Sequence, residues 1–455
     1  MVDNTTIPQR VHIIGAGGSG MSGLAKLLSQ LGHTVTGSDV KPGRMLDSLS
    51  DVGITTWLGH KPEAMANVDL VVASSAVPDR DLELAAARDR GVDIWRRPAL
   101  LKALTAQRRT FGFAGTHGKT TSTALAVAAL RSVGMNPTFL VGGEMIGLNT
   151  GASVGTDDLF LLEADEAFGT FQHLNLDALM VTNIEADHLD HYGTVAALED
   201  AFAQVAGRIT GPTVVCADDA GVRRLAQKVD VITYGFAPDA QWRIRDLEHH
   251  GGAVSFRLEG ATTTTDVTLP KPGEHLASNA AGVLALLAES GLEIAAAAAA
   301  MSQFRGVKRR YEIAAIVDGV TVVDDYAHHP TEVAATIAAA SVGSRGRVIA
   351  VFQPHRYTRT ADLAPEFGAP LALADQVIVS EIYAAGERPI IGVTGRLVSQ
   401  SVEAAGGSVA FVPRLTDIPD RIAAMAEPGD VVLLLGAGDI SSISGDVALA
   451  IEAGR

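Results

Sequence analysis

Short apolar runs alternate with stretches of helical character along almost the whole chain. This pattern is typical of parallel sheets whose strands are connected by helices, so it predicts the α/β class. The first block opens with a strand at 10–15, a glycine-rich turn, a helix through about residue 31 and a strand at 33–38. Further strands are expected at 68–74 and 92–95, and a short helix from Pro98 to about Ala106, with a linker at 107–109.

The second block repeats this order with a strand at 110–114, another glycine-rich turn and a helix from Lys119 to about Val133. Strands at 159–163 and 178–183 follow. Residues 241–269 change to β-rich alternation, which predicts an antiparallel appendage to the central sheet. Helices are expected at 275–290 and 294–304.

The third block alternates again, with strands expected at 320–325, 347–353, 376–380 and 430–435. A length of 455 residues suits three domains of about 150 residues each. We therefore expect a Rossmann-like domain at 1–107, a central domain at 108–310 with a mostly parallel sheet of the P-loop ATPase type, and a Rossmann-like domain at 311–455.

The charge and composition exclude several partners. The formal net charge of −16 disfavours nucleic acid as the main partner. No apolar run reaches the roughly 18 residues of a membrane span, so membrane insertion is not expected. The single cysteine, Cys216, forbids an internal disulfide, and the first residues lack the pattern of a signal peptide. A cytoplasmic protein is therefore predicted.

The first glycine-rich turn, Gly15-Ala16-Gly17-Gly18-Ser19-Gly20, lies between a strand and a helix. In this position glycines let backbone amides at a helix N-terminus approach a diphosphate. Asp39 closes the second strand, where a ribose hydroxyl is bound in such folds. The motif fits NAD and a nucleotide sugar equally well.

The second turn, Gly115-Thr116-His117-Gly118-Lys119-Thr120-Thr121, ends in the Gly-Lys-Thr of a nucleotide-triphosphate loop. In such a loop the lysine neutralises the β and γ phosphates and the following threonine ligates Mg²⁺. Phe113 stands where the usual first glycine would fall, so this is a compact variant of the loop. We predict ATP binding.

Two acidic segments, 162–166 and 183–191, follow the next strands of the central block. Carboxyl ends of parallel strands face the ligand crevice of an open α/β sheet. A solvated loop is the expected setting for most of these acidic residues. Glu163 and His188 are the exceptions, and we predict that they serve as metal ligands.

Two polar clusters mark the third block. Residues 324–330 (DDYAHHP) join a strand to a helix, and residues 353–360 (QPHRYTRT) end the next strand. Arg356 and Arg359 can neutralise phosphate or hold a carboxylate through two hydrogen bonds. We expect the two clusters to lie at adjacent strand ends.

Taken together, these motifs resemble the muramyl ligase family, and within it the branch that adds alanine. The resemblance covers essentially the whole chain. The matching text is GAGGSGMSGLA at 15–25, SSAV at 74–77, GTHGKTT at 115–121, EADE at 163–166, NIEADHLD at 183–190, DDYAHHPTE at 324–332, FQPHRYTRT at 352–360 and GAGDI at 436–440.

The resemblance implies an ATP-dependent ligase of cell-wall precursor synthesis. ATP converts the lactyl carboxylate of UDP-N-acetylmuramate to an acyl phosphate, and the amine of L-alanine then displaces phosphate. The expected cofactors are ATP and Mg²⁺, as two ions, with Mn²⁺ as a substitute, and a homodimer is one possible assembly. The UDP-sugar residues implied are Gly15, Gly17, Gly18, Ser19, Gly20, Asp39 and Ser74.

The resemblance also assigns roles in the other two domains. ATP is expected at Gly115, Thr116, His117, Gly118, Lys119, Thr120, Thr121, His275 and Asn279. Thr120 and Glu163 hold one Mg²⁺ and His188 a second. Lys119, His188, Arg310 and Asp325 are the catalytic residues implied. Tyr326, His328, Arg356 and Arg359 match the region that receives alanine.

One position departs from the family and three alternatives remain. Leu276 replaces the first asparagine of a Gly-x-His-Asn-x-x-Asn motif, which leaves His275 and Asn279 for adenine or ribose. Sibling ligases carry a lysine soon after the metal-binding histidine, and no lysine occurs between His188 and Lys228. A muramyl-peptide recycling ligase is the nearest alternative. An NAD-dependent dehydrogenase would explain the first glycine-rich turn but not the ATP-type turn at 115–121. A binding-only or regulatory ATPase would need no acceptor site.

Overall fold

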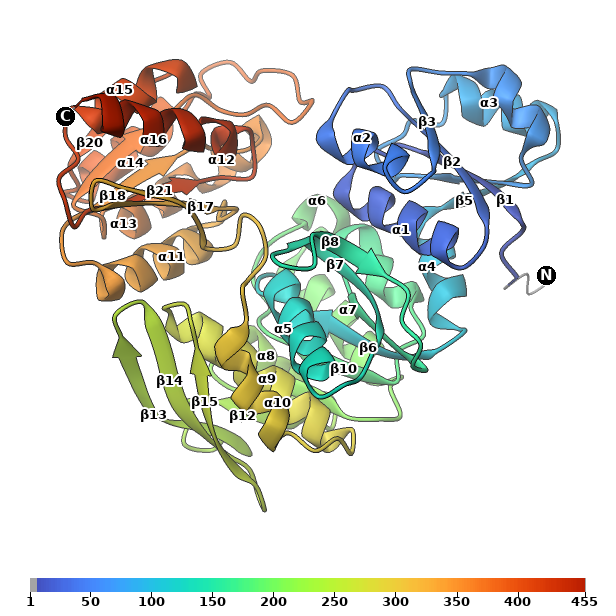
Figure 1. Ribbon diagram of the computed structural model, residues 1–455, viewed down its shortest axis with the longest axis horizontal. Coiled ribbons are helices and arrows are strands. Elements are labelled where there is room, and N and C mark those ends of the chain that lie inside the picture. Colours follow the sequence, from blue (N-terminus) through green and yellow to red (C-terminus); the bar gives the residue numbers. More distant parts are fainter. Residues whose placement is uncertain (1–5, 455) are drawn as a thin grey trace. The chain divides into compact units, whose positions relative to one another are not determined.

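The structure is a computed structural model that describes residues 6–454, apart from the side chain of Asp190, the last residue of the NIEADHLD motif. It contains three sheets, and each lies within one of the three predicted domain ranges (Figure 1). The predicted α/β class is thereby confirmed. Chain contacts group the residues into two compact units: one runs to Arg245 and takes in Leu258–Thr265 and Ser278–Met301, and the other holds Asp246–Arg257, Asp266–Ala277 and the chain from Ser302 onward. The domain boundaries at 107 and 310 stay predictions.

The first sheet has five parallel strands in the order β3-β2-β1-β4-β5. Its strands are β1 (Arg10–Ile14), β2 (Thr34–Asp39), β3 (Thr55–Leu58), β4 (Leu70–Ala73) and β5 (Asp93–Arg96). The connections contain α1 (Ser19–Gln30), α2 (Arg44–Ser50), η1 (Pro62–Asn67), α3 (Leu82–Asp89) and α4 (Arg97–Thr105).

Alternating side chains give this sheet two covered faces. Val11 and Ile13 of β1 pack in the same core as Leu24 of α1, whereas Ile14 packs with Leu84 of α3 on the other side. Successive side chains of a strand point to opposite faces, so both faces of a buried parallel strand must be apolar. The carboxyl ends of the strands are thereby left as the edge at which polar residues can gather.

The central sheet has ten strands in the order β15-β14-β13-β12-β11-β10-β6-β9-β7-β8. The strands are β6 (Arg109–Ala114), β7 (Thr138–Met145), β8 (Thr150–Ser153), β9 (Leu159–Glu163), β10 (Ala178–Val181), β11 (Thr213–Cys216), β12 (Ile232–Gly235), β13 (Trp242–His250), β14 (Ala253–Glu259) and β15 (Thr264–Leu269). Strand β6 already includes Arg109, so the predicted linker at 107–109 is one residue too long at its end. The strands from β12 to β9 pair in parallel, and β7 pairs with β8 antiparallel.

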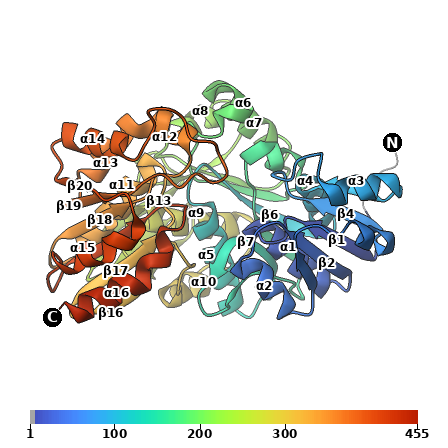
Figure 2. The same cartoon turned by 90° about the horizontal axis from the view of Figure 1, so that it is seen from above.

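The helices of this part are α5 (Lys119–Ser132), η2 (Ala167–His173), α6 (Leu189–Tyr192), α7 (Val195–Ala206), α8 (Ala220–Ala226), α9 (Glu274–Glu289), α10 (Ala295–Ala300) and η3 (Met301–Gln303). Helix α5 packs on β6, β7 and β9, where Figure 2 shows it close to β6 and β7. Only Gly251 and Gly252 separate β13 from its neighbour β14, a connection that antiparallel strands allow and parallel strands do not.

The C-terminal sheet has six strands in the order β16-β17-β21-β18-β19-β20. The strands are β16 (Glu312–Val317), β17 (Val320–Asp325), β18 (Val348–Phe352), β19 (Gln376–Val379), β20 (Val409–Phe411) and β21 (Val431–Leu435). The helices are α11 (Pro330–Gly343), α12 (Tyr357–Leu363), η4 (Ala364–Phe367), α13 (Gly368–Leu371), α14 (Arg396–Ala404), η5 (Leu415–Asp417), α15 (Ile418–Ala423), η6 (Ile440–Ile443) and α16 (Ser444–Ala453). Except for the antiparallel pair β16–β17, its strands pair in parallel.

Two cores again sandwich this sheet. Ala350 and Phe352 of β18 face α11 and α14, and Ile349 and Val351 face α15 and α16. Figure 2 shows α15 and α16 together on their side of the sheet. Among residues 6–454, no helix has the length and apolar character needed to cross a membrane.

Candidate active site

The first glycine-rich loop is held by the end of β2. The amides of Gly15 and Ala16 donate to the Ser38 carbonyl at 2.8 and 2.9 Å. The Gly17 amide donates to the Asp39 carboxylate at 2.9 Å, and a Cβ at Gly17 would lie 2.9 Å from the same oxygen. Only glycine therefore lets this turn lie so close to the Asp39 side chain.

Two further strand ends complete this edge. Ser74 directly follows β4, and a Cβ on Gly15 would come within 3.0 Å of its side chain. Gly15 has φ +81°, which glycine adopts without strain. The structure thus brings Gly15–Gly20, Asp39 and Ser74 together at the carboxyl ends of β1, β2 and β4.

The second loop, 115–121, needs its two glycines for both conformation and space. Gly115 has φ +125° and Gly118 has φ +86°. A Cβ on Gly115 would lie 2.1 Å from the Thr182 hydroxyl, and one on Gly118 would lie 2.8 Å from the Asn279 amide oxygen. The loop is therefore packed tightly against the segment after β10 and against Asn279 of α9.

Oxygen atoms surround the Nζ atom of Lys119. Its Nζ donates to the Gly115 carbonyl at 2.7 Å and to both carboxylate oxygens of Glu166 at 2.9 and 2.8 Å. Asp165 lies 3.7 Å away. Burial opposes the charge, but the two carboxylates raise the pKa of Lys119 above its usual range, so the side chain carries a full positive charge.

Glu166 does not lie in a solvated loop, and for this residue the sequence-based expectation was wrong. Its side chain is only 1% exposed and is the closest carboxylate partner of Lys119. The register of the sheet explains the encounter, because Glu163 pairs with Phe113 on β6. The acidic segment after β9 therefore lies beside the loop that follows β6.

The metal-ligand candidates lie on either side of this loop. Glu163 accepts a hydrogen bond from the Gly142 amide. His188, at φ +54°, directly precedes α6, and its Nε2 lies 3.9 Å from carboxylate oxygens of both Glu166 and Asp187. The Thr120 hydroxyl and the Glu163 carboxylate are oxygen donors, which Mg²⁺ prefers. The residues present therefore fit a magnesium ion, which would supply positive charge to phosphate oxygens.

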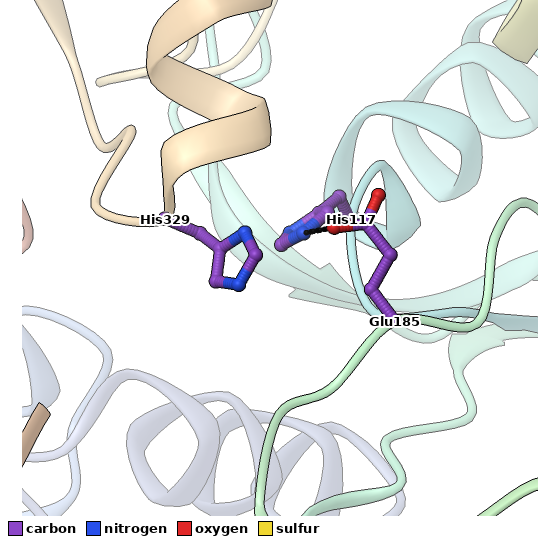
Figure 3. A group of neighbouring side chains, drawn as sticks. All are labelled: His117, Glu185 and His329. Atoms are coloured by element: carbon purple, nitrogen blue, oxygen red, sulfur yellow. Dashed lines mark ion pairs between the residues drawn. The ribbon is translucent and has the colours of Figure 1, made fainter. Parts of the chain in front are cut away.

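The segment after β10 contributes further polar contacts. Asn183 accepts the His117 amide at 2.8 Å, and His117 Nε2 lies 3.5 Å from the Glu185 carboxylate (Figure 3). His329, also drawn in Figure 3, belongs to the other unit. Tyr192 donates from its hydroxyl to the Glu166 carbonyl at 2.6 Å. Asn183 and Glu166 had no predicted role, and the only sequence signal was their place in acidic segments after two strands.

In the C-terminal unit, Asp325 is buried at the end of β17. Its oxygens accept the amides of Tyr311 and Ala327 at 2.6 and 2.7 Å, and burial raises its pKa. The Arg310 guanidinium lies over the Tyr326 ring at 5.0 Å and 3.8 Å from a Glu332 oxygen. Arg310, Asp325 and Tyr326 are thus brought together.

Two histidines meet beside this group. His328 Nδ1 lies 3.0 Å from the Tyr326 carbonyl and 3.2 Å from Glu332. The His355 ring lies 6.0 Å from the His328 ring and stacks on Tyr383. Burial and the neighbouring cations lower the pKa of His355 to about 4, so it is neutral at pH 7.

The two polar clusters are not at adjacent strand ends, because β21 lies between β17 and β18. Sequence order does not reveal that a strand near the chain's end inserts between two earlier ones. As a result, the 436–440 loop comes between the two clusters: Gln353 donates to Asp439 at 2.7 Å, and Arg309 donates to the Gly436 carbonyl at 2.6 Å.

Arg356 and Arg359 differ in their surroundings. Arg356 has φ +71°, and its Nε donates to Glu387 at 2.6 Å. Burial would raise the pKa of Glu387, but its bonds with Thr358 and Arg356 lower it to about 2. Glu387 was not predicted. Arg359 lies in the first turn of α12, one turn after Arg356.

His275 lies in the second unit, at the start of α9. A Cβ on Gly273 would come within 2.6 Å of the His275 ring. His275 lines a cavity of about 280 Å³ together with Ala335 and Ala339. Leu276, the departure from the family motif, is buried. Its side chain therefore packs inside the protein.

Comparison with known proteins identifies the family. Residues 10–109 match the "Mur ligase family, catalytic domain", residues 113–287 the "Mur ligase middle domain", and residues 309–438 the "Mur ligase, glutamate ligase domain". The chain belongs to the Mur ligase family. The resemblance inferred from the motifs is thereby confirmed.

Individual relatives of this Mur ligase are similar over nearly their full length. The UDP-N-acetylmuramate–L-alanine ligase of Acidothermus cellulolyticus is 41% identical, over 97% of this chain and 93% of the relative. The crystal structure of the UDP-N-acetylmuramate–alanine ligase of Thermotoga maritima is 27% identical with a TM-score of 0.84, over 98% of this chain and 100% of that one. A murein peptide ligase from Psychrobacter arcticus is 25% identical with a TM-score of 0.71, over 98% and 99%.

Proposed function

We propose that this Mur ligase joins L-alanine to the lactyl carboxylate of UDP-N-acetylmuramate and converts ATP to ADP and phosphate. The observation that carries the proposal is the 41% identity, over 97% of the chain, to a relative named for this reaction. The two glycine-rich loops and the arginine-histidine cluster supply what such a reaction needs: a diphosphate site, a triphosphate site and a site for an amino-acid carboxylate.

The first loop binds the UDP-sugar. Amides at the start of α1 bind its diphosphate, because a helix N-terminus carries partial positive charge and unpaired N–H groups. Asp39 orients the loop through the Gly17 amide and accepts a ribose hydroxyl at its second oxygen. Ser74 lies against the same turn.

The second loop binds ATP. Lys119 exchanges contacts with Glu166 for contacts with β and γ phosphate oxygens, which carry more charge than one carboxylate. Thr120 and Glu163 hold Mg²⁺, and His188 takes part in holding a second ion. His275 and Asn279 bind the adenosine part. The second ion and the use of Mn²⁺ stay predictions.

The C-terminal unit binds alanine. The alanine carboxylate and amine are received by Arg359, Tyr326 and His328. Arg356 belongs to the same group and is held by its hydrogen bond to Glu387. The pKa of His355 is lowered to about 4, so the side chain is neutral at pH 7 and adds no positive charge that would repel the alanine ammonium group before that group loses a proton. Asp325 holds the backbone of Tyr311 and Ala327 and thereby positions Arg310 and Tyr326, the residues next to them in the chain.

The reaction proceeds in two steps. A carboxylate oxygen of the muramate attacks the γ phosphorus, and the bond to the bridging oxygen of ADP breaks. The alanine nitrogen then attacks the acyl carbon, phosphate leaves with the former carboxylate oxygen, and the amine loses a proton. Both steps move negative charge rather than form bonds to the protein, so cations and positioning supply the catalysis.

A muramyl-peptide recycling ligase is the second candidate, supported by the full-length match to the murein peptide ligase. The decisive experiment measures ADP release from ATP in the presence of Mg²⁺ and UDP-N-acetylmuramate. L-alanine, glycine, L-serine or the cell-wall tripeptide is added in turn as the second substrate. We expect release over many turnovers only when UDP-N-acetylmuramate and L-alanine are both present. Release that needs the tripeptide instead would favour the recycling ligase. The homodimer and the cytoplasmic location stay predictions.

A further inference from the structure

Arg97 lies between the two glycine-rich loops. It begins α4, directly after β5, at the same edge of the first sheet as the Gly15–Gly20 loop. A Cβ on Gly20 would lie 3.4 Å from Nε, Cζ and Nη2 of its guanidinium, so the charged group rests against the first turn of α1. Helix α4 also packs on η2, the segment that follows the EADE motif.

Arg97 has a buried hydrogen-bond donor that the described residues leave without an acceptor. Its Nε is buried and has no hydrogen-bond partner among the described residues. Nη1 lies 3.7 Å from the nearest Asp165 oxygen, which is an ion pair but too long for a hydrogen bond. The side chain is 24% exposed. A buried donor without an acceptor costs about 1–3 kcal/mol, and such groups in native proteins are rare.

Arg97 is linked by charge to the ATP loop. The other oxygen of Asp165 lies 3.7 Å from Nζ of Lys119, so one carboxylate lies between the two cations. This arrangement places Arg97 on the path from the diphosphate site at Gly20 to the triphosphate site at Lys119. In the proposed reaction, the carboxylate of the sugar nucleotide must lie on that path, because it attacks the γ phosphorus.

We propose that Arg97 binds the reactive carboxylate of the sugar-nucleotide substrate and presents it to the ATP loop. This inference rests on the proposed function. The guanidinium offers parallel N–H groups that match a carboxylate. The diphosphate, by contrast, already has the amides of the α1 N-terminus. Arg97 therefore selects a UDP-sugar that carries a lactyl acid over one that does not.

The test compares two ligands that differ only in the lactyl group. Binding of UDP-N-acetylmuramate and of UDP-N-acetylglucosamine to the full chain is measured by calorimetry, without ATP, for wild type, Arg97→Ala and Arg97→Lys. We expect Arg97→Ala to weaken binding of UDP-N-acetylmuramate by about 10- to 100-fold, the value of a charged hydrogen bond, and that of UDP-N-acetylglucosamine by less than about twofold. Arg97→Lys keeps the positive charge but loses the paired N–H groups of the guanidinium. Its affinity for UDP-N-acetylmuramate should therefore fall several-fold, and its affinity for UDP-N-acetylglucosamine should not change.

A matched control is Arg88→Ala, which removes a half-exposed arginine from α3 of the same domain. It should leave both affinities unchanged. If Arg97→Ala weakens the binding of both ligands equally, Arg97 contacts the diphosphate or only supports the loop, and the proposal is wrong. If neither affinity changes, Arg97 does not touch the substrate. If Arg97→Ala fails to fold, Arg97→Lys decides by the same comparison.

The wild-type measurement separates this inference from the proposed function. A wild type that binds neither UDP-sugar would contradict the function itself. A wild type that binds UDP-N-acetylmuramate more tightly than UDP-N-acetylglucosamine, with Arg97→Ala unchanged in that preference, would contradict only the role of Arg97. Steady-state kinetics add a second readout: Arg97→Lys should raise KM for the muramate while KM for ATP stays within about twofold.

Discussion

The two glycine-rich loops share a backbone design and differ in the charges around them. Each follows a parallel strand and opens a helix, α1 or α5. The first loop contacts one carboxylate, Asp39, through a backbone amide. The second places a charged lysine against Glu166 and Asp165, and the charge of Glu163 also acts on it. In the proposed function, the same turn binds a diphosphate through amides alone or a triphosphate through a cation and a metal.

This difference says where each loop is vulnerable. The first depends on close approach of its backbone, so it should be sensitive to added side-chain atoms. The second depends also on charge, so it should be sensitive to loss of Lys119.

The largest effect is expected for Lys119→Ala. Loss of a buried cation at the transferring phosphoryl group should lower kcat by roughly 10²- to 10³-fold or more, while binding of the UDP-sugar stays nearly unchanged. Kinetics and calorimetry measure the two quantities. Lys228→Ala, which removes an exposed lysine from another surface, serves as the control. A Lys119→Ala variant that loses the UDP-sugar yet still hydrolyses ATP would contradict the division between the loops.

Added side chains should separate the loops cleanly. Gly17→Val should raise KM for the UDP-sugar by about tenfold or more with little change in KM for ATP, because its Cβ would collide with Asp39 at 2.9 Å. Gly118→Ala should raise KM for ATP with little change in KM for the UDP-sugar, since Gly118 has φ +86° and Asn279 lies 2.8 Å from the added atom. If each variant raises both KM values alike, the loops do not act separately.

The comparison extends to the C-terminal unit through Arg359→Ala. Loss of a contact to the alanine carboxylate should raise KM for alanine by roughly 10- to 100-fold. Formation of the acyl phosphate from ATP and the muramate alone should continue, which borohydride trapping as an alcohol can detect. Equal loss of trapping and ligation would mean that Arg359 does not act on alanine.

The last effect is on stability rather than on catalysis, and it concerns the support beneath the first loop. Glu83 is fully buried and bonds to Ser38, the residue whose carbonyl holds the loop, at 2.5 Å, and to Trp57 at 2.8 Å. Burial would raise its pKa, but hydrogen bonds from His12, Ser38 and the Lys61 amide lower it to about 2, below the ordinary 4.5.

Because the folded-state pKa lies below the unfolded one, Glu83 stabilises the fold above about pH 4.5, and this contribution is lost as the pH falls towards 2. The difference in unfolding free energy between wild type and Glu83→Gln, measured by urea unfolding, should shrink by about 3 kcal/mol between pH 6 and pH 2. A difference that is independent of pH would show that the carboxylate charge has no such role.

Much of the fold could be predicted because buried parallel strands appear as apolar runs, as for β6 and β10. Short or partly exposed strands lack that signal, and β3, β8, β12, β16 and β20 were not predicted. Strands β7 and β11 were not predicted either, although most of their apolar residues are buried. Strand order is also not readable from sequence order, which explains why β21 between β17 and β18 was unexpected.

The same limit applies to the site. Lys119, Gly115 and Asp39 could be found because local motifs mark them. Glu166 could not be distinguished from other acidic residues, since its contact with Lys119 depends on the register between β6 and β9. The partner of Arg356, Glu387, lies in a different loop with no motif.

The most direct test of the account follows oxygen from the muramate to phosphate. UDP-N-acetylmuramate labelled with ¹⁸O in its lactyl carboxylate is incubated with the enzyme, ATP, Mg²⁺ and L-alanine, and the inorganic phosphate is analysed by mass spectrometry. We expect each phosphate released to carry one ¹⁸O atom, because the carboxylate oxygen that attacked phosphorus leaves with it. Unlabelled phosphate formed in step with the alanine product would contradict the acyl-phosphate route.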